Sequence, residues 1–163
     1  MSAPTLHMIC GKIAAGKSTL AASLEQHRRT VRLSEDSWLA TLYSDQMESF
    51  QDYLRVSSKL QTIMTPHVTE LLQAGLSVVL DFPANTRNQR AWMREVIDRS
   101  GADHQMHLLL TPDAVCLDRL RARNADGTHP FAATEAQFEQ MSRHFSPPTE
   151  AEGFTLIHHD YHG

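Results

Sequence analysis

Short apolar runs alternate along the chain with segments whose apolar residues recur every three or four positions. The runs predict strands, and the segments between them predict helices. The run "LSVVL", Leu76 to Leu80, is continuous and too short for a surface helix, so we expect a strand buried on both faces. The other expected strands cover residues 5–10, 30–33, 105–110 and 154–157. Strands that alternate with helices are typical of βαβ units, so the pattern predicts a five-stranded parallel sheet sandwiched by helices.

The helical segments carry recognisable start and stop signals. Residues 36–50 and 60–72 have apolar positions at helical spacing, and we expect Pro66 to kink or restart the second of these helices. Thr111 and Pro112 are predicted to be the N-cap and first residue of a later helix, and Thr134 with Gln137 resembles a capping box. We expect the first strand to be central, with the strands that end at Ser34 and Asp81 on one side of it.

Length and composition are those of an ordinary globular protein. The chain has 163 residues, of which 41% are hydrophobic and 21% charged, so we expect a single domain over residues 1–163. Its net charge of −4 offers no general attraction to nucleic acid or anionic lipid. The first residues lack the pattern of a signal peptide, and no apolar run approaches the length of a membrane span, so we expect a cytoplasmic protein without a membrane partner. Cys10 and Cys116 are expected to be buried thiols.

The stretch "GKIAAGKS", Gly11 to Ser18, fits the pattern G-x-x-x-x-G-K-[ST]. It follows a predicted strand and precedes a predicted helix, which is the context that a phosphate-binding loop requires. Backbone amides of such a loop and the positive end of the helix face the phosphates, Lys17 reaches the outer phosphates, and Ser18 is placed to bind Mg²⁺. The predicted nucleotide-binding residues are Gly11, Ala14, Ala15, Gly16, Lys17, Ser18 and Thr19, whereas Lys12 is expected to be solvated.

Two aspartates follow predicted strands, where ligands bind in open α/β sheets. Asp36 in "RLSEDSW" can accept a proton from an attacking hydroxyl, and it can also cap the next helix. Glu35 is the weaker candidate for the base. Asp81 ends the most apolar strand and can order Mg²⁺ through its water shell, although aspartate is also an ordinary turn residue there. Asn85 and Arg87 can orient a substrate or belong to an ordinary loop.

Arginines precede a loop rich in turn residues. Arg119 and Arg123 lie four positions apart on one helical face, just before a predicted lid at about 124–133. An arginine on a lid can stabilise the charge of a phosphoryl group in transfer, whereas arginines on a helix are often simply solvated. Arg87, Arg90 and Arg94 form a second stripe, for which a solvated face is the favoured interpretation.

Several histidines invite a metal hypothesis. The stretch "IHHDYHG" at 157–163 lacks the fixed geometry that zinc requires. His7, His104 and His107 lie in or beside predicted strands, so we expect core or interface histidines.

Taken in chain order, these motifs resemble a group of small P-loop kinases with an AAA-type ATP-binding domain. The group includes phage-type polynucleotide 5′-hydroxyl kinases, chloramphenicol phosphotransferases, zeta toxins and gluconate kinases. "GKIAAGKST" is similar to their P-loop, "SEDSW" to the aspartate after their second strand, "VVLDFPANTRNQRAWM" to a strand, Asp and Asn before a basic helix, and "RARNADGTHPF" to the start of their lid. Polynucleotide kinases carry a second basic lid residue, whereas this chain has "ADGTH" there.

The resemblance implies a nucleoside-kinase-like P-loop fold with a short lid, and phosphorylation of a hydroxyl by ATP and Mg²⁺. It implies Asp36 as the base and Arg123 as a lid residue. A small-molecule acceptor is favoured over nucleic acid, because the chain lacks overall basic charge. Two alternatives remain open: a nucleotide-dependent switch or slow ATPase without an acceptor, and a 5′-hydroxyl nucleic-acid kinase.

Overall fold

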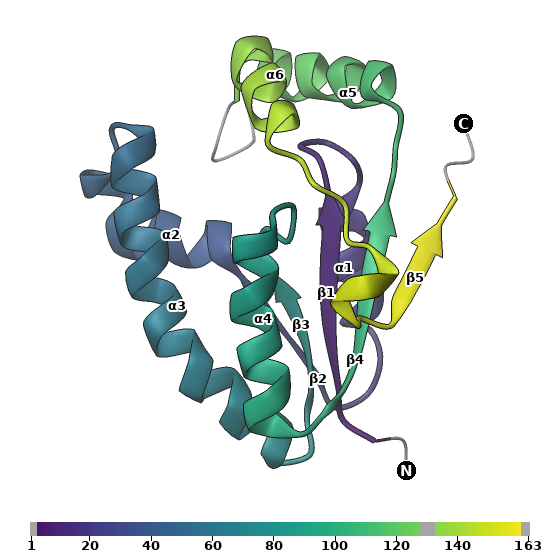
Figure 1. Ribbon diagram of the computed structural model, residues 1–163. Helices are drawn as coiled ribbons and strands as arrows, with labels where there is room; N and C mark the ends of the chain where they lie inside the picture. The colour runs from purple at the N-terminus through teal and green to yellow at the C-terminus, as the bar shows by residue number, and fades with distance from the viewer. Residues whose placement is uncertain (1–2, 128–132, 161–163) are drawn as a thin grey trace.

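Five strands form one parallel sheet in the order β2-β3-β1-β4-β5 (Figure 1). The computed structural model describes residues 3–127 and 133–160. The strands are β1 (Thr5–Gly11), β2 (Thr30–Ser34), β3 (Ser77–Asp81), β4 (Asp103–Leu109) and β5 (Leu156–His159). The predicted parallel sheet is therefore confirmed, with β1 central and with β3 and β2 on one side of it.

Helices cover both faces of this sheet. The α-helices are α1 (Lys17–Leu24), α2 (Glu35–Tyr43), α3 (Phe50–Gln73), α4 (Arg87–Ser100), α5 (Asp113–Asp126) and α6 (Glu135–Arg143), and the 3-10 turns are η1 (Ser44–Gln46) and η2 (Glu150–Glu152). Figure 1 shows α3 and α4 side by side over one face, α1 behind the sheet, and α5 with α6 above the end of β4. None of the described helices combines the length and apolar character needed to cross a bilayer.

Alternate residues of β1 enter two different cores. Leu6 and Met8 are fully buried with apolar residues of α3 and α4, whereas Ile9 is buried with Ala21 of α1. Successive side chains of a strand point to opposite faces, so this alternation places the two helical layers on the two sides of the sheet. A third cluster packs Ala14 and Ala15, from the loop after β1, against α5 and α6.

Helix boundaries differ from the sequence prediction in several places. The segment expected to be one helix over 36–50 contains α2 and η1, and α3 begins at Phe50 with Ser49 as its N-cap. The expected restart at Pro66 is wrong, because α3 runs through this residue. A helix that already has its amphipathic face buried can tolerate the loss of one backbone hydrogen bond.

The start of α5 and the position of β5 also differ. Thr111 is not the N-cap of α5, because Pro112 holds that position and the helix begins at Asp113. The Thr111 hydroxyl instead donates a hydrogen bond to the carbonyl of Ala15 at 2.8 Å. Strand β5 begins at Leu156, two residues later than predicted. Residues 128–132 of the predicted lid lie outside the described residues.

Candidate functional site

The loop between β1 and α1 has left-handed backbone at two positions. Gly16 has φ +106° and is the N-cap of α1, while Ala14 has φ +64°. A Cβ added to Gly11 would lie 3.2 Å from atoms of Ala15 and Leu109, so this position has almost no room for a side chain. The loop therefore needs glycine at position 16 for its backbone angle and at position 11 for close packing.

The amino-terminal end of α1 is open to an anion. Among the described residues, no side chain caps this end of the helix and no acidic residue stands in its first turn. The first amides of a helix lack partners within the helix and carry the positive end of its dipole. Lys17, Ser18 and Thr19 form this first turn, so the predicted phosphate-binding residues are brought together around one positive end.

Three side chains from distant parts of the chain hold the loop. Asn85 accepts a hydrogen bond from the Gly11 amide and donates one to the Gly11 carbonyl, both at 2.9 Å. Thr111 binds the Ala15 carbonyl, and Arg119 donates to the Ala14 carbonyl at 3.3 Å. Asn85 had been considered as a substrate-orienting residue, but its amide pairs with the loop backbone. The partners lie 74 to 105 positions apart, so no local pattern could have revealed them.

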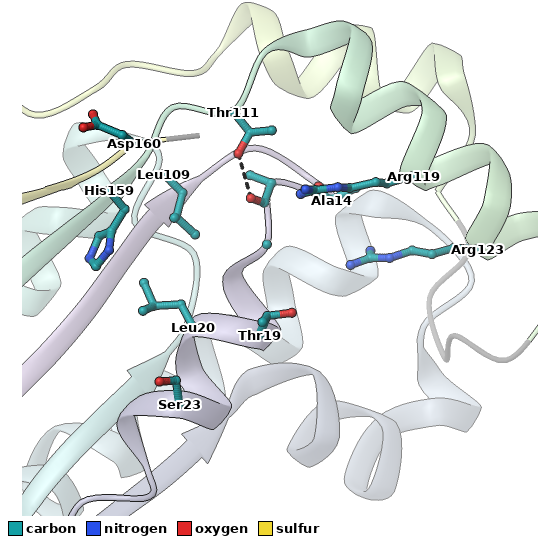
Figure 2. A pocket seen from close by; sticks show the side chains of 12 residues that line it. Ala14, Thr19, Leu20, Ser23, Leu109, Thr111, Arg119, Arg123, His159 and Asp160 are labelled. Atoms are coloured by element: carbon teal, nitrogen blue, oxygen red, sulfur yellow. Dashed lines mark hydrogen bonds between the residues drawn. The ribbon is translucent and has the colours of Figure 1, made fainter. Parts of the chain in front are cut away.

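A pocket of about 460 Å³ opens beside this loop (Figure 2). Arg119 and Arg123 of α5 line it together with the loop and the first turns of α1, and β4 and β5 supply the opposite wall. Figure 2 shows both arginines on the side of α5, with His159 and Asp160 at the other end of the pocket. The two predicted arginines thus face the same pocket as the loop. Its lining residues are Ala14, Ala15, Gly16, Thr19, Leu20, Ser23, Leu109, Thr111, Arg119, Arg123, His159 and Asp160.

Asp36 lies in the first turn of α2, directly after β2. Ser34 is the N-cap of this helix and accepts a hydrogen bond from the amide of Ser37, so the alternative that Asp36 caps the helix is wrong. Ser34 is also in register with Asp81 of β3, which places the start of α2 at the carboxyl edge of the sheet. The phosphate-binding loop leaves the sheet at this same edge, because it follows β1 in a parallel sheet.

Glu35 anchors this helix start. The carboxylate of Glu35 is buried and accepts hydrogen bonds from Tyr53 at 2.5 Å and from Ser57 at 2.9 Å. Burial raises the pKa of Glu35, the two hydrogen bonds oppose the rise, and the charges of Asp36 and Lys17 also act on it. Glu35 is thus engaged with α3, and Asp36 remains the candidate base.

Asp81 ends β3 as predicted, but it has a basic neighbour that was not foreseen. Its carboxylate accepts a hydrogen bond from Arg32 of β2 at 2.8 Å, and 16% of the Asp81 side chain is exposed. Arg32 also pairs with Glu25 at 3.5 Å. Asp81 therefore pairs with the guanidinium of Arg32 at the edge of the sheet where Mg²⁺ was predicted to bind.

Two predictions about basic residues are wrong. Lys12 pairs with Asp113 at 2.9 Å and lies over the ring of Phe145, with only 22% of its side chain exposed. Arg90 is 1% exposed and pairs with Glu152 at 2.8 Å, so this part of the α4 stripe is buried. Their partners, Asp113 and Glu152, are distant in sequence, so neither the loop position of Lys12 nor the helical spacing of Arg90 could reveal these pairs.

The fold and the loop define a P-loop nucleotide-binding protein of the α/β class. The chain matches the family model described as "AAA domain" over residues 6–148, and it belongs to this family of P-loop kinase-like proteins. No curated protein matches the chain in sequence.

Solved structures share the fold at low sequence identity. A candidate kinase from Chloroflexus aurantiacus is 23% identical with a TM-score of 0.75, and the match covers 98% of this chain and 86% of that one. The APS kinase CysC of Mycobacterium tuberculosis, in complex with AMPPNP and APS, is 19% identical with a TM-score of 0.64, covering 99% and 92%. A chain of the Pnkp1/Rnl/Hen1 RNA repair complex is 19% identical with a TM-score of 0.67, and only 44% of that chain is covered, against 88% of this one. The predicted kinase-like fold is thereby confirmed.

Proposed function

We propose that this protein is a phosphotransferase that moves the γ-phosphoryl group of ATP to a hydroxyl of a small molecule. The observation that carries the proposal is the pocket in which the phosphate-binding loop, the open end of α1 and two arginines of α5 face one another. A loop with a helix end is sufficient to hold a nucleotide. Cations opposite the loop additionally stabilise charge on a phosphoryl group in transfer.

In the proposed reaction, the acceptor oxygen attacks the γ-phosphorus of ATP. A bond forms between these two atoms, the bond from the γ-phosphorus to the bridging oxygen breaks, and ADP leaves. The hydroxyl proton moves to the carboxylate of Asp36. Lys17 binds the outer phosphates, while Arg119 and Arg123 stabilise the charge on the transferring group. The acceptor would lie between α2 and α3, with Asp36 at its hydroxyl.

Mg²⁺ would be held by the hydroxyl of Ser18 and by Asp81. The donor set fits a hard cation because both groups supply oxygen, and the pairing of Asp81 with Arg32 suits contact through water. When bound, the ion neutralises charge on the phosphate oxygens of ATP. The chain's own contribution is the placement of these two groups: Ser18 lies in the first turn of α1, after the loop that follows β1, and Asp81 ends β3, the strand beside β1.

Replacing Asp36 tests the proposed base. Asp36→Asn keeps the size of the side chain and removes its ability to accept the proton, so ATP affinity should stay within about twofold while transfer falls by about 100-fold or more. The matched control is Asp45→Asn, in the exposed turn η1 of the same segment. Calorimetric titration with ATP gives the affinity. Transfer of labelled γ-phosphate to a panel of hydroxyl-bearing metabolites, antibiotics and 5′-hydroxyl oligonucleotides gives the activity.

The same experiment separates the alternatives. A switch or slow ATPase would release phosphate with no labelled product from any acceptor. Equal transfer by Asp36→Asn and by the control would remove Asp36 from the mechanism. Failure of ATP to bind the wild-type protein would contradict the proposal as a whole.

A further inference from the structure

Three histidines form a continuous chain of hydrogen bonds across the sheet. Nδ1 of His7 lies 3.0 Å from Nε2 of His107, and Nδ1 of His107 lies 2.8 Å from Nε2 of His159. The three rings come from β1, β4 and β5, with centroids 5.3 and 5.0 Å apart and with successive ring planes tilted by 31° and 35°. His107 in the middle is 3% exposed. We call His7, His107 and His159 the histidine chain. The phosphate-binding loop does not require it.

The register of the strands directs the histidine chain toward the pocket. His107 is opposite Ile9, two residues beyond His7, and His159 is opposite Leu109, two residues beyond His107. Diagonal neighbours of this kind are within reach of long side chains. Each step therefore moves two residues toward the carboxyl edge of the parallel sheet. The last ring, His159, lines the pocket beside the phosphate-binding loop (Figure 2).

The position of His159 in the pocket suggests what it would contact. The phosphate-binding loop and the first turn of α1 form one end of the pocket, and His159 with Asp160 forms the other end. Leu20 and Leu109 lie between the two ends and offer apolar surface. A nucleotide with its phosphates at the loop would therefore extend its nucleoside part past these leucines toward His159.

Proton counting couples the two ends of the histidine chain. A neutral imidazole has one N–H group and one acceptor nitrogen. Three neutral rings therefore have three N–H groups, of which two are used in the bonds between the rings. The third N–H is on the outer nitrogen of His159 or on that of His7, and never on both. A group that binds one end as donor or acceptor thus fixes the state of the other end.

Burial favours the neutral form of two rings of the histidine chain, His107 and His7. Burial of His107, followed by the neighbouring charges of His7 and His159, lowers the pKa of His107 to about 4. Burial and the nearby His27 also lower the pKa of His7. Asp160 lies at the same end of the pocket as His159, whereas Arg119 and Arg123 line the pocket from α5.

We propose that His159 hydrogen-bonds to the nucleoside part of the bound nucleotide, and that the histidine chain transmits this contact as a change of tautomer to His7. This inference rests on the nucleotide binding proposed above and adds a recognition residue to that site. The ligand class is a nucleoside triphosphate. Inorganic triphosphate, which lacks the nucleoside, would bind the loop without acting on the histidine chain.

Nitrogen NMR of the histidine side chains tests this inference in the wild-type protein. Shifts of ring nitrogens distinguish the donor from the acceptor state of each nitrogen. At neutral pH, saturation with AMPPNP and Mg²⁺ should change the ring shifts of both His159 and His7, whereas saturation with inorganic triphosphate should leave His7 unchanged. His104 is on β4 but outside the histidine chain, since it accepts a hydrogen bond from the Thr155 amide, and it serves as the internal control.

Variants separate the contact of His159 with the nucleoside from the transmission of a tautomer change to His7. His159→Gln should weaken AMPPNP by about fivefold to tenfold, the effect of one hydrogen bond, and leave the affinity for triphosphate unchanged. The matched control is His158→Gln, the exposed neighbour on β5, which should bind both ligands as the wild type does. In His107→Leu, AMPPNP should still bind while the response of His7 disappears.

Each remaining outcome contradicts the inference in a recognisable way. An unchanged His7 at saturating AMPPNP overturns the transmission, and a response of His7 to triphosphate assigns the effect to the loop. Equal affinities of the two glutamine variants remove His159 from the site. Absence of AMPPNP binding to the wild type would instead overturn the proposed function, and the inference with it.

Discussion

The imidazole of His107 should make the folded state sensitive to acid. Its pKa is lowered to about 4 in the folded protein, compared with an ordinary value of 6.5. The unfolded chain therefore binds a proton more readily, and folding stability is complete above about pH 6.5 and falls as pH decreases toward 4. The difference between the two pKa values corresponds to a loss of about 3 kcal/mol in the free energy of unfolding once His107 is protonated in both states. Urea unfolding at a series of pH values measures this loss.

His107→Asn is the variant for comparison. It removes the titrating ring, so its free energy of unfolding should change less between neutral and acidic pH than that of the wild type. Because Asn is smaller and loses the contacts of His107 with His7 and His159, the variant should be less stable at every pH. The comparison therefore uses the slope of the free energy of unfolding against pH. Parallel curves for the two proteins would contradict the role of His107.

Single residues show where sequence reasoning succeeds and where it stops. Gly16 and Lys17 could be assigned because a phosphate-binding loop is a local pattern with a local mechanism. Sequence reasoning could not assign the contact of Asn85 with Gly11 or the histidine chain, because each joins residues that only the folded sheet brings together. The roles of Asp36 and Arg123 stay predictions, since their chemistry depends on a bound nucleotide and acceptor.

At the scale of elements, α4 is tied to η2 by a buried ion pair. Arg90 donates to Glu152 at 2.8 Å and to the carbonyl of Ala84 at 2.9 Å. Burial acts to raise the pKa of Glu152, but the hydrogen bonds from Arg90 and from the Thr149 amide outweigh it and leave the pKa below its usual range. Arg90 therefore fixes the segment between α6 and β5 to α4, and Arg94 of the same helix adds a hydrogen bond to the carbonyl of Glu152 at 3.2 Å.

Neutralising Glu152 should destabilise the protein strongly. Glu152→Gln retains the shape of the side chain and leaves the buried charge of Arg90 without its counter-ion, at an expected loss of about 3 kcal/mol. Glu150→Gln, in the same turn and exposed, should change stability by less than about 0.5 kcal/mol. The midpoint of urea unfolding gives both values, and equal midpoints would contradict the structural importance of this pair.

Element types were more predictable than element ends. The apolar pattern predicted all five strands along the chain, because burial on one or both faces leaves a clear pattern. The expected central place of β1, with β2 and β3 on one side of it, is confirmed by the sheet order. The starts of α2 and α3 differ from the prediction because Ser34 and Ser49 cap them through hydrogen bonds from the amides of Ser37 and Asp52, which apolar periodicity does not report. Thr111 fits a capping pattern, but its hydroxyl binds the phosphate-binding loop.

For the whole molecule, charge argues against a nucleic-acid acceptor. The net charge of −4 gives little reason for counterions to be released from a phosphate backbone. We expect a 5′-hydroxyl oligonucleotide to bind weakly, with an affinity that changes little with salt. Fluorescence anisotropy of a labelled oligonucleotide at increasing salt measures this. Tight binding that weakens steeply with salt, together with ATP-dependent labelling of the 5′ end, would establish the nucleic-acid kinase instead.

The arrangement of the whole molecule explains why its class could be predicted while its acceptor could not. The phosphate-binding loop could be predicted because its glycines, lysine and serine follow a fixed local pattern between a strand and a helix. An acceptor pocket has no fixed sequence pattern, because function depends on particular side chains grafted on a fold. The solved structures with this fold include an APS kinase and a chain of an RNA repair complex, so the fold alone does not select among acceptors.

The backbone conformation of Ala14 depends on residues from distant parts of the chain. Its left-handed backbone costs about 1 to 2 kcal/mol for a residue with a side chain. The bonds that hold its loop come from Asn85, Thr111 and Arg119, which are 74, 96 and 105 positions away from their partners. A peptide containing the whole motif would lack all three supports. The sequence of the motif alone therefore does not carry its structure. Transfer of the motif into another protein would require equivalents of these three distant hydrogen-bonding residues as well.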